Sequence, residues 1–198
     1  MNILYSDENL IVCIKPVGAD SEKQLPNQIA EHFGGEVHTV HRLDMNVGGV
    51  MVYARNPQTA AYLSKIIAQG DMIKEYVALV HGTPEIGGVL EDFLFKDSRK
   101  NKVYAVKKQR AGVKYAKLEF KRLTDSNPCL VHIRLHTGRS HQIRVQFASR
   151  GFPLVGDHKY GSRSELKSPM LYSYKITFPY KNKIVAFESK PDWANIQE

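Results

Sequence analysis

Short apolar segments separated by polar turns run along this chain, and they predict more strands than helices. Residues 2–5 and 10–15 are apolar and flank the polar turn 6–9, which predicts an amino-terminal hairpin. Two further short strands are expected before and after the tetrad His41-Arg42-Leu43-Asp44. Alternating or β-branched sequences predict additional strands at residues 73–80, 113–123, 129–135 and 171–178.

The clearest helical pattern covers residues 57–69, where apolar side chains recur on one face. Asn56 can cap this helix, because its side chain can accept a hydrogen bond from the first turn. Pro57 suits the first helical position, and Gly70 is placed to end the helix.

Two weaker patterns predict one helix on each side of the first. One covers about Ser21 to Phe33 and is stopped by Gly34-Gly35; the other starts near Ser140, whose hydroxyl can cap it, and runs to Ser149. Strands and helices follow one another irregularly, without the regular alternation of a doubly wound sheet. The pattern therefore predicts an α+β fold with a largely antiparallel sheet.

Length and composition set the class of protein. The 198 residues, 42% of them hydrophobic, allow one sizeable core, and we expect a single domain over residues 1–198 with two lobes. No stretch approaches the roughly 20 apolar residues of a membrane span, and the first residues lack the features of a signal peptide. Cys13 and Cys129 lie in apolar segments, which predicts buried free thiols in a reducing compartment. We therefore expect a cytoplasmic protein, monomeric and without contact to membranes.

Metal and nucleotide cofactors are not expected. The sequence has no Cys-x-x-Cys pair, and its eight histidines do not fall at the spacings of zinc sites. His132 and His136 are four residues apart, but they lie in a predicted strand and do not make a metal site on their own. No Gly-x-Gly-x-x-Gly or Gly-Lys-Ser/Thr sequence follows a predicted strand, which argues against a dinucleotide or P-loop enzyme.

Positive charge is concentrated in one part of the chain. Lys and Arg outnumber Asp and Glu by 28 to 20, and the segment 96–122, called the basic segment below, holds eleven of the basic residues but two acidic ones. Such a stripe suits binding to a phosphate backbone, and Tyr104 and Tyr115 within it can stack on bases. A solvated hairpin surface would have the same composition. Lys107 and Lys108 are the candidate phosphate contacts.

The tetrad at 41–44 places an arginine two residues from a carboxylate. In an extended segment Arg42 and Asp44 project from one side, and His41 and Leu43 from the other. Asp44 can then serve as a nucleophile or base, with Arg42 free to reach an anionic substrate. A surface ion pair is the alternative interpretation of this pattern.

Further segments give the tetrad a context. The sequence continues with KEYVALVHG at 74–82, RLHTGRSHQIRV at 134–145 and GFPLVGDHKYG at 151–161, and it opens with ILYSDENLIVCIKP at 3–16. These blocks, in this order and at these separations, resemble the RluA-like family of pseudouridine synthases over nearly the whole chain. Many members carry an additional amino-terminal S4 module, whereas this sequence starts directly at the catalytic domain. RNA affinity is then expected from the catalytic domain, above all from the basic segment.

The resemblance implies a fold and an activity. The fold would be a long mixed, mostly antiparallel sheet flanked by helices, with an active-site cleft across its middle. The protein would be an isomerase that converts a specific uridine of ribosomal or transfer RNA to pseudouridine. The reaction detaches uracil from ribose at nitrogen and reattaches it at carbon 5, and it needs no cofactor because the uracil stays in the pocket.

Three residues match the catalytic positions of that family. Asp44 matches its essential aspartate, which either attacks the sugar or removes a ribose proton. Tyr76 matches the tyrosine whose ring stacks on the target base and whose hydroxyl can serve in the final proton removal; without the resemblance it is a strand tyrosine of the core. Arg144 matches the arginine that pairs with the aspartate and keeps it ionised; without the resemblance it is a helix-surface charge.

Other residues match substrate-binding positions. Arg42 is the candidate to fill the gap left by a flipped base or to contact phosphate. Arg139 would brace its loop or touch the RNA backbone, and Ile143 would pack against the base. His141, near the start of a predicted helix, is expected to form hydrogen bonds in the loop.

One departure and two alternatives accompany the resemblance. After Asp44 the family usually has a basic residue and then Thr-Ser-Gly, whereas this sequence continues Met45-Asn46-Val47-Gly48-Gly49, without the hydroxyls. The main alternative function is a catalytically silent RNA-binding protein of the same fold. The other is a nucleosidase or glycosylase, which also uses a carboxylate but releases the base.

Overall fold

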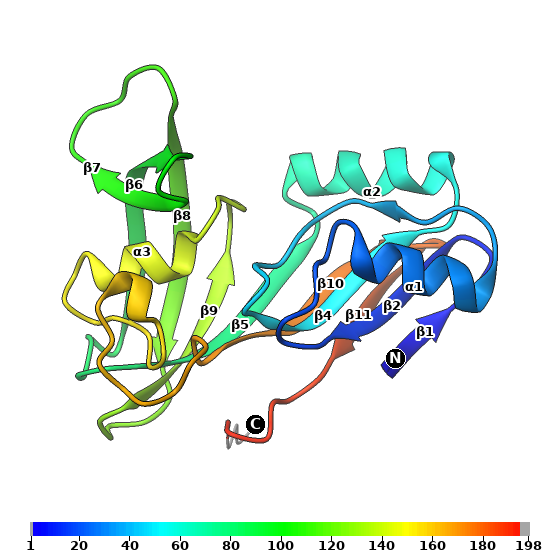
Figure 1. Ribbon diagram of the computed structural model, residues 1–198. Coiled ribbons are helices and arrows are strands. Elements are labelled where there is room, and N and C mark those ends of the chain that lie inside the picture. The colour runs from blue at the N-terminus through cyan, green and yellow to red at the C-terminus, as the bar shows by residue number, and fades with distance from the viewer. Residues whose placement is uncertain (1, 195–198) are drawn as a thin grey trace. The chain divides into compact units, whose positions relative to one another are not determined.

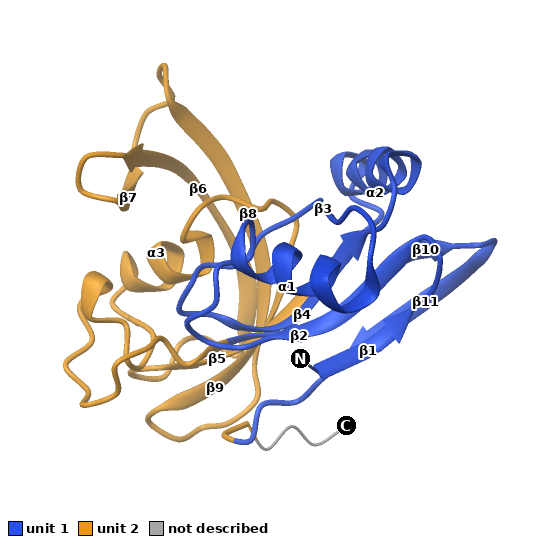
Figure 2. Ribbon diagram, turned by 45° about the vertical axis from the view of Figure 1, so that its right-hand side comes forward, with its two compact units in different colours: residues 1–74, 172–192 blue, residues 75–171, 193–198 orange. Residues whose placement is uncertain are grey.

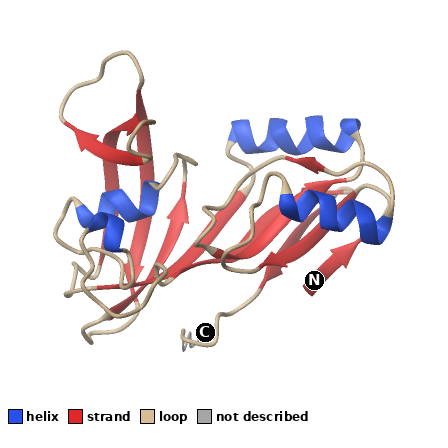
Figure 3. Ribbon diagram, in the orientation of Figure 1, coloured by secondary structure: helices blue, strands red, loops and turns tan. Residues whose placement is uncertain are grey.

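The computed structural model describes residues 2–194 and contains eleven strands and three α-helices there (Figures 1 and 3). This content confirms the α+β class. The chain divides into two compact units, which are described in turn (Figure 2). Unit 1 contains residues up to 74 and 172–192, and unit 2 contains residues 75–171 and the chain from 193 onward.

The strands of unit 1 follow the order β1-β2-β4-β10, with β3 beside β4 and β11 beside β10. Their bounds are β1 (Asn2–Ser6), β2 (Leu10–Lys15), β3 (His38–Thr39), β4 (Gly48–Ala54), β10 (Leu171–Tyr180) and β11 (Lys183–Glu188). The pairs are antiparallel except for β4 and β10, which run parallel. The amino-terminal hairpin and the two strands around the tetrad are thus confirmed.

Strand β11 was not predicted. It follows β10 through the two-residue turn Lys181-Asn182, in which both residues have positive φ, of 48° and 62°. That conformation is typical of the tight turns that join hairpin strands. The side chains of β11 are exposed or half-buried, and its sequence does not alternate between apolar and polar residues. A strand without a buried face lacks the pattern by which strands were predicted.

Strand β4 is buried along its whole length, and the unit is built around it. On one face Val50 and Val52 pack with Leu63 and Ile66 of α2 (Pro57–Gln69). On the other face the hydroxyl of Tyr53 donates a hydrogen bond to the backbone just before α1 (Gln24–Phe33). A strand covered on both faces holds the loop before it, residues 40–47, on a rigid base.

Helix α2 has the predicted bounds. The side chain of Asn56 accepts a hydrogen bond from the N–H of Thr59 at 2.8 Å, and Gly70 ends the helix with φ at 83°. Helix α1, in contrast, begins at Gln24 and not at Ser21, so its predicted start was wrong. The carboxylate of Asp20 accepts the N–H groups of residues 22 and 23, which holds residues 21–23 in a turn before the helix.

The strands of unit 2 follow the order β5-β9-β8-β6-β7. Their bounds are β5 (Ile73–Val80), β6 (Gly87–Asp97), β7 (Lys102–Val106), β8 (Val113–Arg122) and β9 (Cys129–Leu135). Strands β5, β8, β9 and, in unit 1, β10 confirm the predicted segments to within two residues. Strands β6 and β7 were missed, because β6 starts with two glycines and carries acidic residues in its middle, and β7 lies within the basic segment.

The third helix, α3 (Gln142–Ala148), covers one face of this sheet. Its Val145 packs with Leu94, Val103 and Ala116 of three neighbouring strands. The predicted cap was wrong: the residue before the helix is His141, in the left-handed conformation with φ at 50°, and no side chain caps the first turn.

The prediction of buried free thiols is confirmed by the structure. Cys13 and Cys129 are both buried and free. None of the helices within residues 2–194 has the length and apolar character needed to cross a bilayer.

Candidate active site

Asp44 lies in unit 1, on the loop between β3 and β4. Leu43 and Val47 on either side of it are buried, Arg42 is exposed and Asp44 is half-buried, as the alternation in the tetrad predicts. The N–H of Val47 donates to the carbonyl of Asp44 at 2.9 Å and closes a turn. The carboxylate is therefore carried by a backbone segment anchored at both sides.

The backbone before Asp44 is held by buried hydroxyls. The Oγ of Ser21 donates to the carbonyl of Leu43 at 3.0 Å, and the hydroxyl of Tyr53 donates to the carbonyl of Ser21 at 2.8 Å. This series links the loop through the turn before α1 to the buried strand β4. Sequence reasoning missed both residues, because their partners lie more than 20 positions away.

Lys15 is a buried cation close to the same loop. Its Nζ donates to the carbonyl of Pro16 at 2.9 Å and to that of Met45 at 3.1 Å, and no part of the residue is exposed. Burial lowers the pKa of Lys15 to about 8, against the opposing effect of the negative charges of Asp44 and Asp20. The ammonium group is therefore largely protonated at neutral pH and adds positive charge beside Asp44. In the sequence, the one indication of this buried cation was a lysine at the end of a predicted apolar strand.

The first residue of the tetrad has a structural partner. The N–H of Val52 donates to Nε2 of His41 at 3.0 Å. Desolvation of the ring, and to a smaller extent the positive charge of Lys74, lower the pKa of His41 to about 3. The imidazole is thus neutral at physiological pH, and an accepting ring nitrogen requires that form.

Gly48, which stands where the family usually has Ser, and Gly49 both lie in crowded positions. A Cβ on Gly48 would lie 3.2 Å from the carbonyl oxygen of Lys15 and 3.3 Å from a methyl group of Val17. Gly49 has φ at 125°, and a Cβ there would overlap the backbone of Ser173 on β10. A side chain at Gly48 would therefore require these neighbours to move by a few tenths of an ångström.

Arg42 forms a surface ion pair. Its Nη1 lies 3.1 Å from a carboxylate oxygen of Glu22, and both side chains are about half exposed. An exposed pair of this kind contributes little to stability, so Arg42 can leave it at small cost.

Arg144 lies in unit 2, on α3, and is not a helix-surface charge, because only 5% of it is exposed. Its Nε donates to Oδ2 of Asp157 at 2.6 Å and its Nη2 donates to Oδ1 at 2.8 Å, and Asp157 is itself buried. The guanidinium carbon lies 5.2 Å from the centre of the Tyr160 ring. Two hydrogen bonds and a ring contact fix the orientation of this cation.

Tyr160 connects Arg144 to its surroundings through its hydroxyl. The hydroxyl accepts the N–H of Val103 at 2.9 Å and lies 2.8 Å from Nδ1 of His141. His141 therefore acts as a hydrogen-bonding residue of the loop. Neither Tyr160 nor Asp157 was named from the sequence, although both lie in the block 151–161 that carried the resemblance.

A second network holds the loop before α3. The amide oxygen of Gln142 accepts hydrogen bonds from the Thr137 hydroxyl and the Arg139 N–H, and its Nε2 donates to the carbonyl of Lys117. The side chain of Arg139 braces the loop as well, because its Nε donates to the carbonyl of Tyr115 at 2.8 Å. Gln142 is a buried polar residue that sequence reasoning missed.

The remaining predicted residues are placed as follows. Tyr76 on β5 and Ile143 on α3 are buried, and Lys107 and Lys108 are exposed in the loop that follows β7. Asp44 and Arg42 belong to unit 1 and the other six predicted residues to unit 2. The pairing of Asp44 with Arg144 and the stacking of Tyr76 on a base stay predictions.

The two histidines with a four-residue spacing have separate partners. His132 pairs with Glu75 at 3.1 Å, and His136 with Glu119 at 2.8 Å. Within residues 2–194, no group of three or more His, Cys, Asp or Glu side chains is arranged to hold a metal ion.

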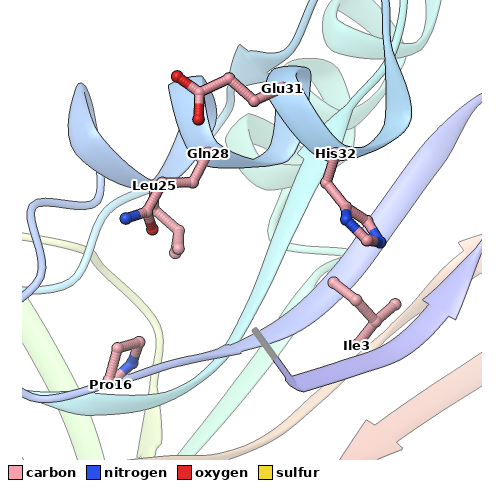
Figure 4. Close-up of a pocket in the computed structure, with 6 residues that line it drawn as sticks. All are labelled: Ile3, Pro16, Leu25, Gln28, Glu31 and His32. Carbon is pink, nitrogen blue, oxygen red and sulfur yellow. The ribbon is translucent and has the colours of Figure 1, made fainter.

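Unit 1 also has an open cavity of about 530 Å³ between α1 and the first two strands (Figure 4). Its lining consists of Ile3, Pro16, Leu25, Gln28, Glu31 and His32. The lining thus combines three apolar residues with three polar ones. The residues predicted for catalysis and substrate binding do not belong to this lining.

Comparison with known proteins gives a consistent picture. A family model described as RNA pseudouridylate synthase matches residues 9–149. The ribosomal large subunit pseudouridine synthase D of Vibrio cholerae is 33% identical over 180 residues, which are 84% of this chain and 54% of that protein. The tRNA pseudouridine synthase C of Vibrio parahaemolyticus is 30% identical over 224 residues, which are 97% of this chain and 91% of that protein.

Among solved structures, human RNA pseudouridylate synthase domain containing 4 superposes with a TM-score of 0.81 at 23% identity, over 97% of this chain and 89% of that one. Its similarity confirms the predicted fold. The chain spans little more than half the length of the Vibrio cholerae relative.

Proposed function

Because this chain belongs to the RNA pseudouridylate synthase family, we propose that it isomerises uridine to pseudouridine in RNA. The matched region, residues 9–149, includes Asp44, Tyr76 and Arg144. The observation that carries the proposal is the buried Arg144, fixed by Asp157 and stacked on Tyr160. Burying such a pair is costly, and replacing it by apolar residues is often neutral or stabilising, so its presence supports a chemical role.

The reaction exchanges one bond for another. The bond between ribose C1′ and uracil N1 breaks, a bond between C1′ and uracil C5 forms, C5 loses its proton and N1 gains one. Asp44 supplies the carboxylate that acts at the sugar, either by attack on C1′ or by removal of a ribose proton. The ammonium group of Lys15 adds a positive charge close to this carboxylate, and Arg144 is the candidate arginine to pair with it during the reaction.

Tyr76 and Ile143 serve the base in this proposal. The ring of Tyr76 stacks on the uracil, and its hydroxyl assists the loss of the C5 proton. Ile143 packs against the same base, which stays in the pocket while it turns, so no cofactor is required. A base inside an RNA stem must first leave its stack, at a cost of a few kcal/mol. Arg42 leaves its pair with Glu22 to fill the gap or to contact phosphate.

We propose ribosomal or transfer RNA as the substrate, in the cytoplasm, with the protein acting as a monomer over one domain. The support for the two RNA classes is the names of the relatives, one a ribosomal large subunit synthase and one a tRNA synthase. Lys107, Lys108 and Arg139 contribute to the binding of the RNA backbone.

The test is a pseudouridine map of total RNA from cells with and without this chain, by carbodiimide labelling and reverse transcription. We expect discrete stops in ribosomal or transfer RNA that disappear without the chain and are restored by the wild type. Asp44→Asn should not restore them, while its affinity for a transcript of the mapped RNA stays close to that of the wild type.

Two results would contradict the proposal. RNA binding without a change at any uridine would identify a catalytically silent binding protein. Release of free uracil from the transcript, measured by chromatography, would identify a glycosylase.

A further inference from the structure

Strands β6, β7 and β8 are neighbours in the sheet of unit 2 (Figure 1), and their register places four aromatic residues on one face. The register pairs Phe95 with Tyr104 across β6 and β7, and Phe93 with Tyr115 across β6 and β8. Phe93 and Phe95 are two positions apart on one strand, so all four rings share a face. The rings of Phe93 and Tyr115 make an edge contact with centres 6.3 Å apart.

This face lies opposite the one that α3 covers. The alternate residues Leu94, Val103 and Ala116 point to the other side and pack with Val145 of the helix. The aromatic face is partly open to solvent, because 37% of Tyr104 and 41% of Tyr115 are exposed. Rings presented in this way have faces available for another planar group.

Cations surround these rings. The guanidinium carbon of Arg110 lies 5.4 Å from the centre of the Phe95 ring, and Nζ of Lys102 lies 5.7 Å from that of Tyr104. Glu91 adds a carboxylate to the face, but it accepts a hydrogen bond from the hydroxyl of Tyr115 and pairs with Lys117 at 3.5 Å. The register also places Asp97 and Glu119 on this face, so the cations that bear on the rings themselves are Lys102 and Arg110.

The face is connected to Arg144 by alternating cations and rings. Arg144 stacks on Tyr160, and Nζ of Lys102 lies 5.5 Å from the centre of that same ring as well as near Tyr104. Lys102 is the first residue of β7, the last strand of the sheet order, and its Nζ lies near both rings. A polyanion bound near Arg144 can follow this series of cations around the strand.

We propose that Phe93, Phe95, Tyr104 and Tyr115 form a stacking platform for unpaired nucleobases, with Lys102 and Arg110 as contacts to the flanking phosphates. The proposal deepens the proposed function, on which it rests for the choice of RNA as the partner. Proteins that bind single strands combine aromatic rings with a basic track in this manner. A duplex keeps its bases stacked inside, so the platform distinguishes single-stranded from double-stranded RNA.

The test compares two RNA probes by fluorescence anisotropy at one salt concentration. One is a labelled oligoadenylate of about twelve nucleotides, a length within the range of known single-strand sites. The other is an RNA duplex of the same length. The variant Tyr104→Leu with Tyr115→Leu keeps apolar bulk on the face but removes two rings. The matched control is Tyr62→Leu, because Tyr62 is 39% exposed and lies on α2, in unit 1.

We expect the double variant to bind oligoadenylate about tenfold more weakly than the wild type, since stacking on aromatic rings supplies much of such affinity. Its duplex affinity should change less than twofold, which also reports that the variant is folded. Tyr62→Leu should change neither. If the double variant loses affinity equally for both probes, the RNA is bound through its phosphates alone. If its affinity for oligoadenylate is unchanged, the rings do not stack on bases. Either result overturns the proposal.

The outcome is independent of catalysis. Oligoadenylate contains no uridine, so its binding does not require turnover, and Asp44→Asn should bind it like the wild type. Failure of the pseudouridine map with a tenfold effect at the rings would reject the enzyme and keep the platform. A positive pseudouridine map with no effect of the ring substitutions would support the enzyme and reject the platform.

Discussion

The guanidinium of Arg144 and the carboxylate of Asp157 form a buried ion pair with two hydrogen bonds, of 2.6 and 2.8 Å. The two residues are 13 positions apart, one on α3 and one in the loop that precedes the turn at residues 158–160. The pair fixes the position of the cation that the proposed mechanism places next to Asp44.

Asp157→Asn should therefore damage both stability and turnover. Removing one partner of a buried ion pair leaves an uncompensated charge, so we expect the free energy of unfolding to fall by about 3–5 kcal/mol in urea titrations. Turnover at saturating RNA should fall more than RNA affinity. Arg144→Met combined with Asp157→Leu removes both charges and should recover most of the stability but none of the activity. A double variant as unstable as Asp157→Asn would argue against the ion pair as the cause.

Lys15 makes stability depend on pH in a defined direction. Its pKa is about 8 in the folded protein and 10.5 in the reference state, so the unfolded chain binds more protons between these values. Stability from this group therefore increases as pH rises from about 8 to 10.5, and its penalty is complete below that range. The change amounts to about 3 kcal/mol. The measurement is the difference in unfolding free energy between the wild type and Lys15→Met across this range, and a flat difference would contradict the burial of the charge.

Tyr76→Phe separates stacking from proton transfer. The variant keeps the ring, so RNA affinity should stay within about twofold of the wild type, while turnover falls by about tenfold or more if the hydroxyl assists proton removal. Single-turnover rates and binding constants on one transcript give both quantities. Near-normal turnover would exclude the hydroxyl from the mechanism and leave Tyr76 as a stacking residue.

Lys107 and Lys108 should act through charge. Reversal of both to Glu should weaken RNA binding and reduce the slope of log affinity against log salt by about one for each phosphate that the protein no longer neutralises. Lys65→Glu with Lys183→Glu is the matched control, because both lysines are exposed and lie outside the basic segment. If the control pair reduces the slope equally, the effect comes from net charge and the RNA does not follow the loop after β7.

Gly49 should tolerate no side chain. Gly49→Ala combines φ at 125° with a Cβ that would overlap the backbone of Ser173, so we expect the unfolding free energy to fall by about 3 kcal/mol or more. Gly70→Ala is the comparison, because Gly70 also has positive φ, at 83°, but its added Cβ would meet no atom within 4 Å. Its unfolding free energy should fall by about 1 kcal/mol. Similar decreases at both positions would mean that backbone conformation, and not the proximity of Ser173, sets the requirement.

Local signals explain which elements were predictable from the sequence. Helix α2 has both of its ends encoded by neighbours, Asn56-Pro57 and Gly70, and its predicted bounds were correct. The start of α1 was wrong because the side chain of Asp20 takes two N–H groups that a longer helix would need. Strands β6 and β7 were missed because the pairing of β6 with both β7 and β8 compensates for glycines and charges that weaken the local pattern.

The same distinction applies to the site. Motifs indicated Asp44, Tyr76 and Arg144 as candidates, since each lies in a block with recognisable neighbours. The groups that position them depend on distant partners: Lys15 reaches the carbonyl of Met45 thirty residues later. Tyr160 reaches Val103 across 57 positions. Neither hydrogen bond has a signal in the neighbouring sequence, so the residues that support the candidate site could be identified only from the structure.

The pairing of Gly49 with Ser173 has a consequence for the order in which the protein matures. Asp44 is synthesised early, but the strand behind it receives its neighbour β10 only after residue 173 has left the ribosome, when Ser173 also donates its Oγ to the carbonyl of Val50. All of residues 75–171 emerge in between and can fold as their own unit. A nascent chain thus carries Asp44 long before β10 pairs with the strand that follows the Asp44 loop, and this support of the loop forms late in synthesis.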